Sequence, residues 1–290
     1  MSTRPMKNQI WHRKSHEDGS FTFVVCGDAH VGITETEYAE IVKQVLSVRP
    51  DFIVFVGDMV TAGRQTACWD AFLKMSKEVI KNMPLYTALG NHEYAYHGGF
   101  DYSVPPALYL NLFQPPGNGL WYSFDYNCTH FIILHVPDKG HLKKGDEQYK
   151  WLVNDLQKAN EEGKTVFVFQ HCACFTSTKI DWAYDGSVLP DLLSSYKNVA
   201  IDFAGHIHTY ERSIYPNKNT GKNFITTGGA GLLYPEYPVD AVSNPYQIAA
   251  AADILHFCKV SVKPKTSIDV EVITIGGMIY EKFVVDIREH

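Results

Sequence analysis

The chain has 290 residues, and 45% of them are hydrophobic, so it can bury a full core and is near the upper limit for one domain. A net charge of -6 at pH 7 argues against the broad basic surface that nonspecific nucleic-acid binding requires. No apolar stretch approaches the ~20 residues of a membrane span, and residues 1–20 are too polar and charged for a signal peptide.

The first residues and the cysteines bear on domain organisation and location. Residues 1–20 show no periodicity and predict an N-terminal lead-in, followed by a single domain over residues 21–290. The six cysteines mostly lie in apolar, strand-like runs, which is typical of reduced core thiols rather than a disulfide framework. Cys172 and Cys174 follow His171 and could be metal ligands, but we interpret them as core or loop thiols. The sequence therefore predicts a soluble, cytoplasmic protein without a membrane partner.

In the first part of the domain, strand and helix patterns alternate. Buried strands are predicted at Phe21–Gly27, Phe52–Val56 and Leu85–Leu89. Between the first two, Thr34-Glu-Thr-Glu37 predicts a capping box for a helix that ends at Pro50. Between the last two, helically spaced apolar residues predict one amphipathic helix from Trp69 to Ile80. This alternation predicts a parallel sheet with right-handed crossovers.

Several of the predicted buried strands end in a residue of a kind that binds metals. Gly57 and Asp58 follow one strand, and three other apolar runs end in glycine plus such residues, namely Gly27-Asp28-Ala29-His30, Gly90-Asn91-His92-Glu93 and Gly205-His206-Ile207-His208. The run Phe167–Gln170 ends in His171 without a glycine. Because the carboxyl ends of parallel strands meet at one edge of a sheet, we expect these turns to lie together.

The spacing within two of these motifs suits a shared centre. In an extended segment, residues two apart point to the same side, so Asp28 and His30 can aim at one centre. His206 and His208 can do the same. A set of imidazole, carboxylate and carboxamide ligands suits Mn, Fe, Zn or Co and argues against a calcium site.

The rest of the chain predicts a long loop, a hairpin, a helix and further strands. Residues Tyr94–Asn118 are rich in Tyr, Pro and Gly without a sustained period, and predict a long ordered loop over the site. Paired strands, a helix and two buried strands then follow at Trp121–Tyr126, His130–Val136, Gly145 onward, Thr165–Gln170 and Val199–Phe203. The C-terminal runs alternate apolar and polar residues and predict a mostly antiparallel second sheet from Phe224–Thr227, Ile254–Val262, Ile268–Ile273 and Met278–Asp286.

The ordered motifs GDxH, GD, GNHE, an isolated His and GHxH resemble those of the calcineurin-like metallophosphoesterase superfamily. The resemblance runs from about Phe21 to beyond Arg212, and Gly205–Arg212 resembles the last motif of purple acid phosphatases. It implies an α/β fold, a four-layer αββα sandwich with two central mixed β-sheets, over the whole domain. It also implies a binuclear metal hydrolase of phosphate esters. We expect a small-molecule phosphate ester as the substrate and, from the net charge, no nucleic acid as a main partner.

The resemblance further implies a role for each motif residue. Asp28, His30 and His208 would hold one metal ion, Asn91, His171 and His206 the other, and Asp58 would bridge the two. The cofactors would be two divalent or trivalent transition metal ions (Mn, Fe or Zn), with a metal-bridging water as the nucleophile. His92 would face the substrate and act as the general acid that protonates the leaving group, and Asp58 would be catalytic with it.

Two positions depart from the purple acid phosphatases. Those enzymes carry a metal-binding tyrosine three residues after the bridging aspartate, where this chain has Thr61. Their first motif also lacks the histidine found here as His30. The sequence therefore predicts a protein that is not purple when loaded with iron.

Several roles stay open at the level of sequence. Glu93 could orient the His92 ring, or it could be solvated or cap the turn. Tyr210 and Arg212 could contact phosphate or anchor a strand or loop. The Tyr94–Tyr109 and Gly228–Pro245 segments could shape the pocket rim or simply pack. The motifs favour a phosphomonoesterase; the alternatives are a phosphodiesterase acting on cyclic or other nucleotides and a catalytically silent metal-binding scaffold. Retention of all seven ligand types together with His92 argues against the scaffold.

Overall fold

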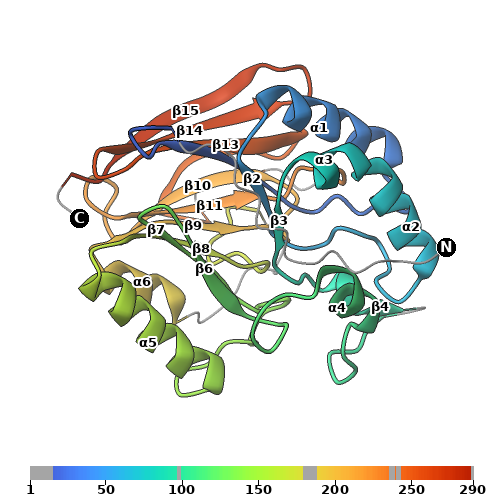
Figure 1. The fold of residues 1–290 in the computed structure, drawn as a ribbon, viewed down its shortest axis with the longest axis horizontal. Coiled ribbons are helices and arrows are strands. Elements are labelled where there is room, and N and C mark those ends of the chain that lie inside the picture. Colours follow the sequence, from blue (N-terminus) through green and yellow to red (C-terminus); the bar gives the residue numbers. More distant parts are fainter. Residues whose placement is uncertain (1–15, 97–98, 179–187, 235–238, 240–242, 289–290) are drawn as a thin grey trace.

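The computed structural model describes residues 16–96, 99–178, 188–234, 239 and 243–288. Two β-sheets pack face to face between two layers of helices (Figure 1). One helical layer consists of α1 (Glu35–Val48), α2 (Thr66–Met75) and α3 (Lys77–Asn82), and the other of α5 (Glu147–Glu161) and α6 (Leu189–Ser195). The four-layer αββα prediction is confirmed. Of the predicted lead-in, residues 1–15 lie outside the described residues.

The first sheet has the strand order β15-β14-β13-β1-β2-β3. Its strands are β1 (Phe21–Cys26), β2 (Phe52–Phe55), β3 (Leu85–Thr87), β13 (His256–Lys263), β14 (Ser267–Thr274) and β15 (Ile279–Asp286). The parallel pairing of β1, β2 and β3 confirms the predicted βαβαβ unit. Of the four C-terminal runs predicted for a second sheet, Phe224–Thr227 does lie there, but the placement of the other three was wrong, because β13 pairs antiparallel with β1 and extends the first sheet with β14 and β15. Alternation shows which face of a strand is buried, but not which neighbour completes its hydrogen bonds.

The second sheet has the strand order β12-β10-β11-β9-β8-β7-β6. Its strands are β6 (Tyr122–Tyr126), β7 (Thr129–Ile133), β8 (Thr165–Phe169), β9 (Val199–Ala204), β10 (Tyr210–Tyr215), β11 (Lys222–Thr227) and β12 (Gln247–Ala251). Parallel pairing from β7 through β9 to β11 combines with antiparallel pairing of β6, β10 and β12. Both sheets are therefore mixed, as predicted.

Aromatic residues fill the space between the two sheets. The ring of Phe23 on β1 stacks on Phe52 of β2 at 5.2 Å and meets the edge of Phe167 on β8 at 5.1 Å. Strands such as β1 also bury the opposite face under helices, since Val24 packs with the α1 and α2 residues. Burying each such side chain contributes about 1.5–3 kcal/mol, so this double burial explains why the ligand-bearing strands read as continuous apolar runs.

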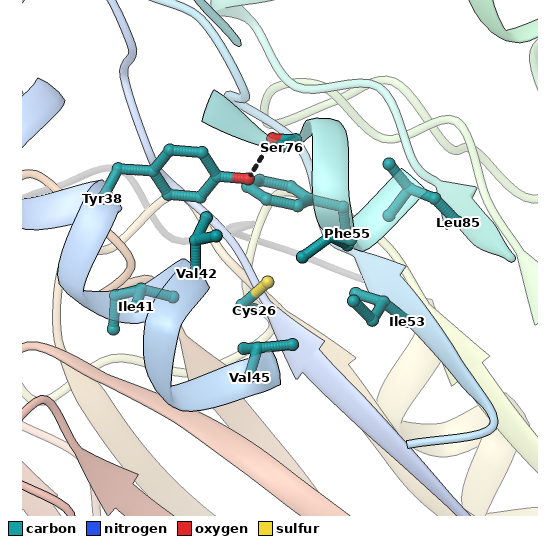
Figure 2. A pocket seen from close by; sticks show the side chains of 10 residues that line it. Cys26, Tyr38, Ile41, Val42, Val45, Ile53, Phe55, Ser76 and Leu85 are labelled. Carbon is teal, nitrogen blue, oxygen red and sulfur yellow. Dashed lines mark hydrogen bonds between the residues drawn. The ribbon is translucent and has the colours of Figure 1, made fainter. Parts of the chain in front are cut away.

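The helix predicted from Trp69 to Ile80 is divided. Ser76 separates α2 from α3, and its buried hydroxyl lies 2.8 Å from the Tyr38 hydroxyl of α1. Figure 2 shows this pair at the rim of a small cavity of about 10 Å³ between α1 and the first sheet, with the Cys26 thiol facing it. The break lets two short helices follow the twisted sheet while one polar pair satisfies its own hydrogen bonds.

Two further local predictions need correction. Thr34 does not form the capping box, because its hydroxyl donates instead to the carbonyl oxygens of Ala29 and His30. The predicted long loop after Tyr94 contains a hairpin of β4 (Ala95–Tyr96) and β5 (Gly99–Phe100), and a helix, α4 (Ala107–Phe113). Among the described residues, no helix combines the length and the apolar character needed to cross a membrane.

Candidate metal centre

The predicted ligands lie in the segments that directly follow β1, β2, β3, β8 and β9. Four of them have a left-handed backbone, with φ of 61° at Asp28, 47° at His30, 54° at Asp58 and 69° at His206. For a non-glycine residue this conformation costs roughly 1–2 kcal/mol, and such strain tends to gather at functional sites. The left-handed backbone at these four positions thus lowers the stability of the fold and turns the side chains toward one site.

Glycines next to the ligands allow the loops to approach closely. A Cβ atom at Gly90 would lie 2.2 Å from Oδ1 of Asp58, and one at Gly205 would lie 2.4 Å from Oδ2 of Asp28. Only glycine leaves room for these carboxylates, which explains the recurrence of glycine before the ligand positions.

One group of potential ligand atoms comes from Asp28, His30, Asp58 and His208, and these atoms all lie within 4.8 Å of one another. Nε2 of His208 is 3.4 Å from Oδ1 of Asp28, and Nε2 of His30 is 3.6 Å from Oδ2 of Asp58. The two Nε2 atoms are 3.2 Å apart. All four side chains are buried.

A second group comes from Asp58, His171 and His206, so Asp58 belongs to both groups. Nε2 of His171 is 3.3 Å from Oδ2 of Asp58. The Asn91 carboxamide joins this group, because its Oδ1 lies 2.9 Å from Nε2 of His171 and 3.1 Å from Nδ1 of His206. Nδ1 of His171 donates to the carbonyl oxygen of Val56 at 2.8 Å, which leaves Nε2 as the ligand atom.

The residues fit a pair of transition-metal ions. Asp28 and Asp58 are fully buried, and within the described part of the chain their ion-pair partners are imidazoles rather than Lys or Arg. Although burial opposes it, the charges of Asp58 and Asp28 raise the pKa of His171 to about 10. The bare cluster therefore attracts extra positive charge, and buried carboxylates of this kind either pair with cations or coordinate metals.

His92 belongs to neither ligand group, although it follows Asn91 directly. Its backbone N–H donates to Oδ1 of Asp58 at 2.8 Å, and its Nδ1 donates to the carbonyl oxygen of Thr61 at 2.6 Å. The ring meets that of His30 edge-on at 4.4 Å. The carbonyl fixes Nδ1 as the protonated atom, so Nε2 is the nitrogen that can serve a substrate.

Glu93 connects the ligand loops instead of orienting His92. Its carboxylate accepts backbone N–H bonds from Asp58 at 2.9 Å, Met59 at 2.9 Å and Gly90 at 2.7 Å. Burial and the charge of Asp58 raise the pKa of Glu93 to about 8, while these three donors favour the carboxylate. The capping alternative is therefore the one that the structure supports.

Tyr210 and Arg212 serve as anchors rather than facing the ligand groups. The Tyr210 hydroxyl donates to Oε2 of Glu281 at 2.5 Å, and Nε of Arg212 donates to Oε1 at 2.9 Å. Because Glu281 lies on β15 of the first sheet and Tyr210 and Arg212 lie on β10 of the second, these bonds connect the two sheets. The Arg212 guanidinium also covers the Phe283 ring at 4.2 Å.

Two further histidines do not join the ligand groups, and one tyrosine of the predicted Gly228–Pro245 rim contacts a ligand residue. His135 and His141 are satisfied locally, with Nε2 of His135 2.7 Å from the Tyr94 hydroxyl and Nδ1 of His141 donating to the Asp138 carbonyl oxygen. Tyr234 stacks on the His208 ring at 4.6 Å, so its segment does reach the site. His12, His97 and Tyr237 lie outside the described residues.

The cysteines agree with the interpretation made from sequence. None of the six, all of which are described, forms a disulfide; Cys26, Cys68, Cys172 and Cys258 are buried, and Cys174 is partly buried. None belongs to either ligand group, which consist of carboxylates and imidazoles.

An αββα sandwich that gathers two ligand groups around a shared aspartate at the carboxyl ends of its strands defines a metallophosphoesterase. The family model of the calcineurin-like phosphoesterases matches residues 21–210. The chain belongs to this family.

Individual relatives refine this assignment. The chain is 28% identical to a phosphoenolpyruvate phosphatase of Allium cepa, over 80% of this chain and 48% of the relative. It is 26% identical to purple acid phosphatase 1 of Ipomoea batatas, over 71% and 46% of the two chains. The structure of a purple acid phosphatase from yellow lupin (Lupinus luteus) seeds superposes with a TM-score of 0.75 at 20% identity, over 92% of this chain and 54% of that one. This chain spans about half the length of these relatives.

Proposed function

We propose that this chain is a binuclear metal-dependent phosphomonoesterase that acts on small-molecule phosphate esters. The observation that carries the proposal is the pair of buried ligand groups that share Asp58, with His92 beside them but in neither. Membership of the calcineurin-like phosphoesterases supports the same chemistry.

In this proposal Asp28, His30 and His208 hold one ion, and Asn91, His171 and His206 hold the other. Asp58 reaches both. Two ions of Mn, Fe or Zn would supply Lewis-acid activation of water and would neutralise charge on the phosphoryl group. Because the ligand side chains are buried, the surrounding protein screens these charges less than water would.

His92 supplies the proton that the leaving oxygen needs. Thr61 accepts the Nδ1 hydrogen, so a proton on Nε2 is the one that His92 gives up, and the ring then keeps its Nδ1 bond as a neutral imidazole. The hydrogen bond from the His92 backbone N–H to the Asp58 carboxylate holds the His92 ring next to the ligand groups. Glu93 supports the same arrangement, because its carboxylate binds the backbone of both the Asp58 loop and the Gly90 loop.

The monoester is preferred because the last motif resembles that of purple acid phosphatases and because the relatives are named as phosphatases. A phosphodiesterase is the alternative enzyme. The experiment is an assay of purified protein, loaded separately with Mn, Fe and Zn, against phosphomonoesters, diesters and cyclic nucleotides. Hydrolysis confined to diesters would reject the preferred substrate class, and binding of both ions without hydrolysis of any ester would favour the scaffold.

Domain organisation and location belong to the same proposal. We infer that residues 21–290 act as one catalytic unit, because strands from both ends of this range pair in one sheet. Limited proteolysis that released a stable fragment from within this range would contradict this. A cytoplasmic location stays a prediction, and cell fractionation tests it.

A further inference from the structure

A row of aromatic rings begins at His92 and runs away from the ligand groups. The Phe100 ring lies 5.1 Å from the His92 ring, and the Tyr102 ring lies 6.4 Å from Phe100 at an interplanar angle of 20°. Beyond Tyr102, the His141 ring follows at 4.5 Å. The row therefore joins the β4–β5 segment to the loop that follows β7.

Phe100 is held in this position from behind. Its backbone pairs with Ala95 across the β4–β5 hairpin, and Arg64 donates through Nη2 to the carbonyl oxygen of Asp101 at 2.8 Å. The Arg64 guanidinium also lies over the Tyr96 ring at 5.1 Å. The hairpin is thus fastened to the segment that follows Asp58, although the Phe100 side chain itself is 44% exposed.

Phe100 lies where it could contact the leaving group of a substrate whose leaving oxygen is hydrogen-bonded to His92. A general acid must lie within about 2.6–3.2 Å of the oxygen that it protonates. A ring attached to that oxygen beside His92 would fall within the 4.5–7 Å centroid distance at which aromatic pairs attract one another. Because the Phe100 ring is partly exposed, burial in the core does not explain its position beside the acid.

The charges around the row favour a neutral group. Arg64, the cation next to the hairpin, is engaged by Asp101 and Tyr96. The Tyr102 hydroxyl donates to the Asp138 carboxylate at 3.1 Å. Burial and the charge of Asp138 raise the pKa of Tyr102, so its ring stays neutral beside a carboxylate. An acidic leaving group would meet this carboxylate, whereas a neutral ring would not be repelled.

We propose that Phe100, with Tyr102 behind it, forms a subsite that binds aromatic, uncharged leaving groups and so selects aryl and arylalkyl phosphates. This inference rests on the proposed function, because it takes His92 to be the acid that meets the leaving oxygen. It adds the class of alcohol or phenol that the enzyme releases.

The test compares benzyl phosphate with ethyl phosphate, whose leaving alcohols are both alkanols of similar acidity and differ in the ring. Wild-type protein should prefer benzyl phosphate, and Phe100→Ala should reduce the ratio of kcat/KM for benzyl over ethyl phosphate by about 10-fold. Phe100→Tyr keeps the ring and should retain the preference. Val104→Ala, an apolar truncation that is also at a side chain 44% exposed in the same segment, should leave the ratio unchanged.

Binding without turnover provides the second readout. Calorimetry with benzylphosphonate and ethylphosphonate on the metal-loaded protein should show the same preference and its loss in Phe100→Ala. Equal binding of the two phosphonates by wild type, or equal effects of Phe100→Ala and Val104→Ala, would overturn the subsite. Failure to hydrolyse these esters or any other phosphomonoester would overturn the proposed function, and the phosphonate comparison would still decide the subsite.

Discussion

The ligand groups and a second histidine cluster lie at opposite ends of β8, since His171 follows this strand and Lys164 precedes it. In the second cluster, Nδ1 of His130 is 2.7 Å from Asp125, and Nε2 is 2.9 Å from Asp155. Lys164 donates to the other oxygen of Asp125 at 2.8 Å. Both clusters combine histidine with aspartate, but among the described residues only the second includes a lysine.

The difference shows how each cluster balances the negative charge of its aspartates. Although burial would lower it, the hydrogen bonds from His130 to Asp155 and Asp125 raise the pKa of His130, so a proton and Lys164 balance the carboxylates. At the other end, Asp28 and Asp58 face imidazoles that crowd one another. A proton and a lysine suffice for the His130 cluster, whereas metal ions suit the ligand groups around Asp58.

The largest expected effect comes from removing the shared carboxylate. Asp58→Asn should lower kcat/KM for a phosphomonoester by more than about 100-fold, because even residues that only support metal ligands contribute 10- to 100-fold. It should also weaken occupancy of both ions, as measured by elemental analysis. Asp155→Asn is the matched control in the second cluster and should keep both ions and the activity. Loss of a single ion in Asp58→Asn would show that the carboxylate does not bridge.

The next effect concerns His92. A positioned proton donor contributes about 10²- to 10⁴-fold, and most where the leaving group is a poor one. His92→Ala should therefore retain both ions and hydrolyse aryl phosphates with acidic phenols fairly well, while alkyl phosphates slow far more. The slope of log kcat/KM against leaving-group pKa measures this. Loss of metal would identify His92 as a ligand, and an equal slowing of all substrates would identify it as a positioning group.

A smaller effect, on stability alone, is expected from the second cluster. Because the folded-state pKa of His130 is raised, its contribution is fully present below the ordinary value of 6.5 and is lost as pH rises through the folded value. His130→Gln should lower the free energy of unfolding by about 2 kcal/mol near pH 6, and less at alkaline pH. Urea denaturation of both proteins across this range measures it. A difference that grows with pH would contradict the imidazolium assignment.

The smallest expected effect is an absent absorption band. Thr61 offers no phenolate, and its hydroxyl donates to the carbonyl oxygen of His30 at 2.7 Å rather than to the ligand groups. The iron-loaded protein should therefore lack the tyrosinate band in its visible spectrum. A strong band would mean that another tyrosine has entered the coordination shell, and Tyr234, stacked on His208, would be the first to replace with Phe.

Much of the candidate site could be predicted because its residues directly follow buried strands. Parallel pairing gathers the ends of β1, β2 and β3 at one edge, so the turns at Asp28, Asp58 and Asn91 follow from local patterns. The role of Glu93 could not be predicted in the same way, because two of its three bonds reach backbone groups 34 and 35 residues away. The periodicity of apolar residues does not predict hydrogen bonds between segments so far apart in the sequence.

The corrections to the fold have a similar origin. The alternation of apolar and polar residues in β13 identified its buried face correctly. Its pairing with β1, however, joins segments far apart in the sequence, so no local pattern predicts it. The helix α4 was missed within a Pro- and Tyr-rich segment because tertiary packing stabilises it, with Tyr109 and Phe113 buried against Trp69. The His130 cluster was missed because its partners Asp125 and Asp155 come from separate elements.

The most direct test of the account is the metal content of active wild-type protein, measured by elemental analysis beside its turnover of a phosphomonoester. The account predicts two transition metal ions per chain, loss of hydrolysis when a chelator removes them and recovery when they are restored. Full activity in protein that contains no metal would contradict it.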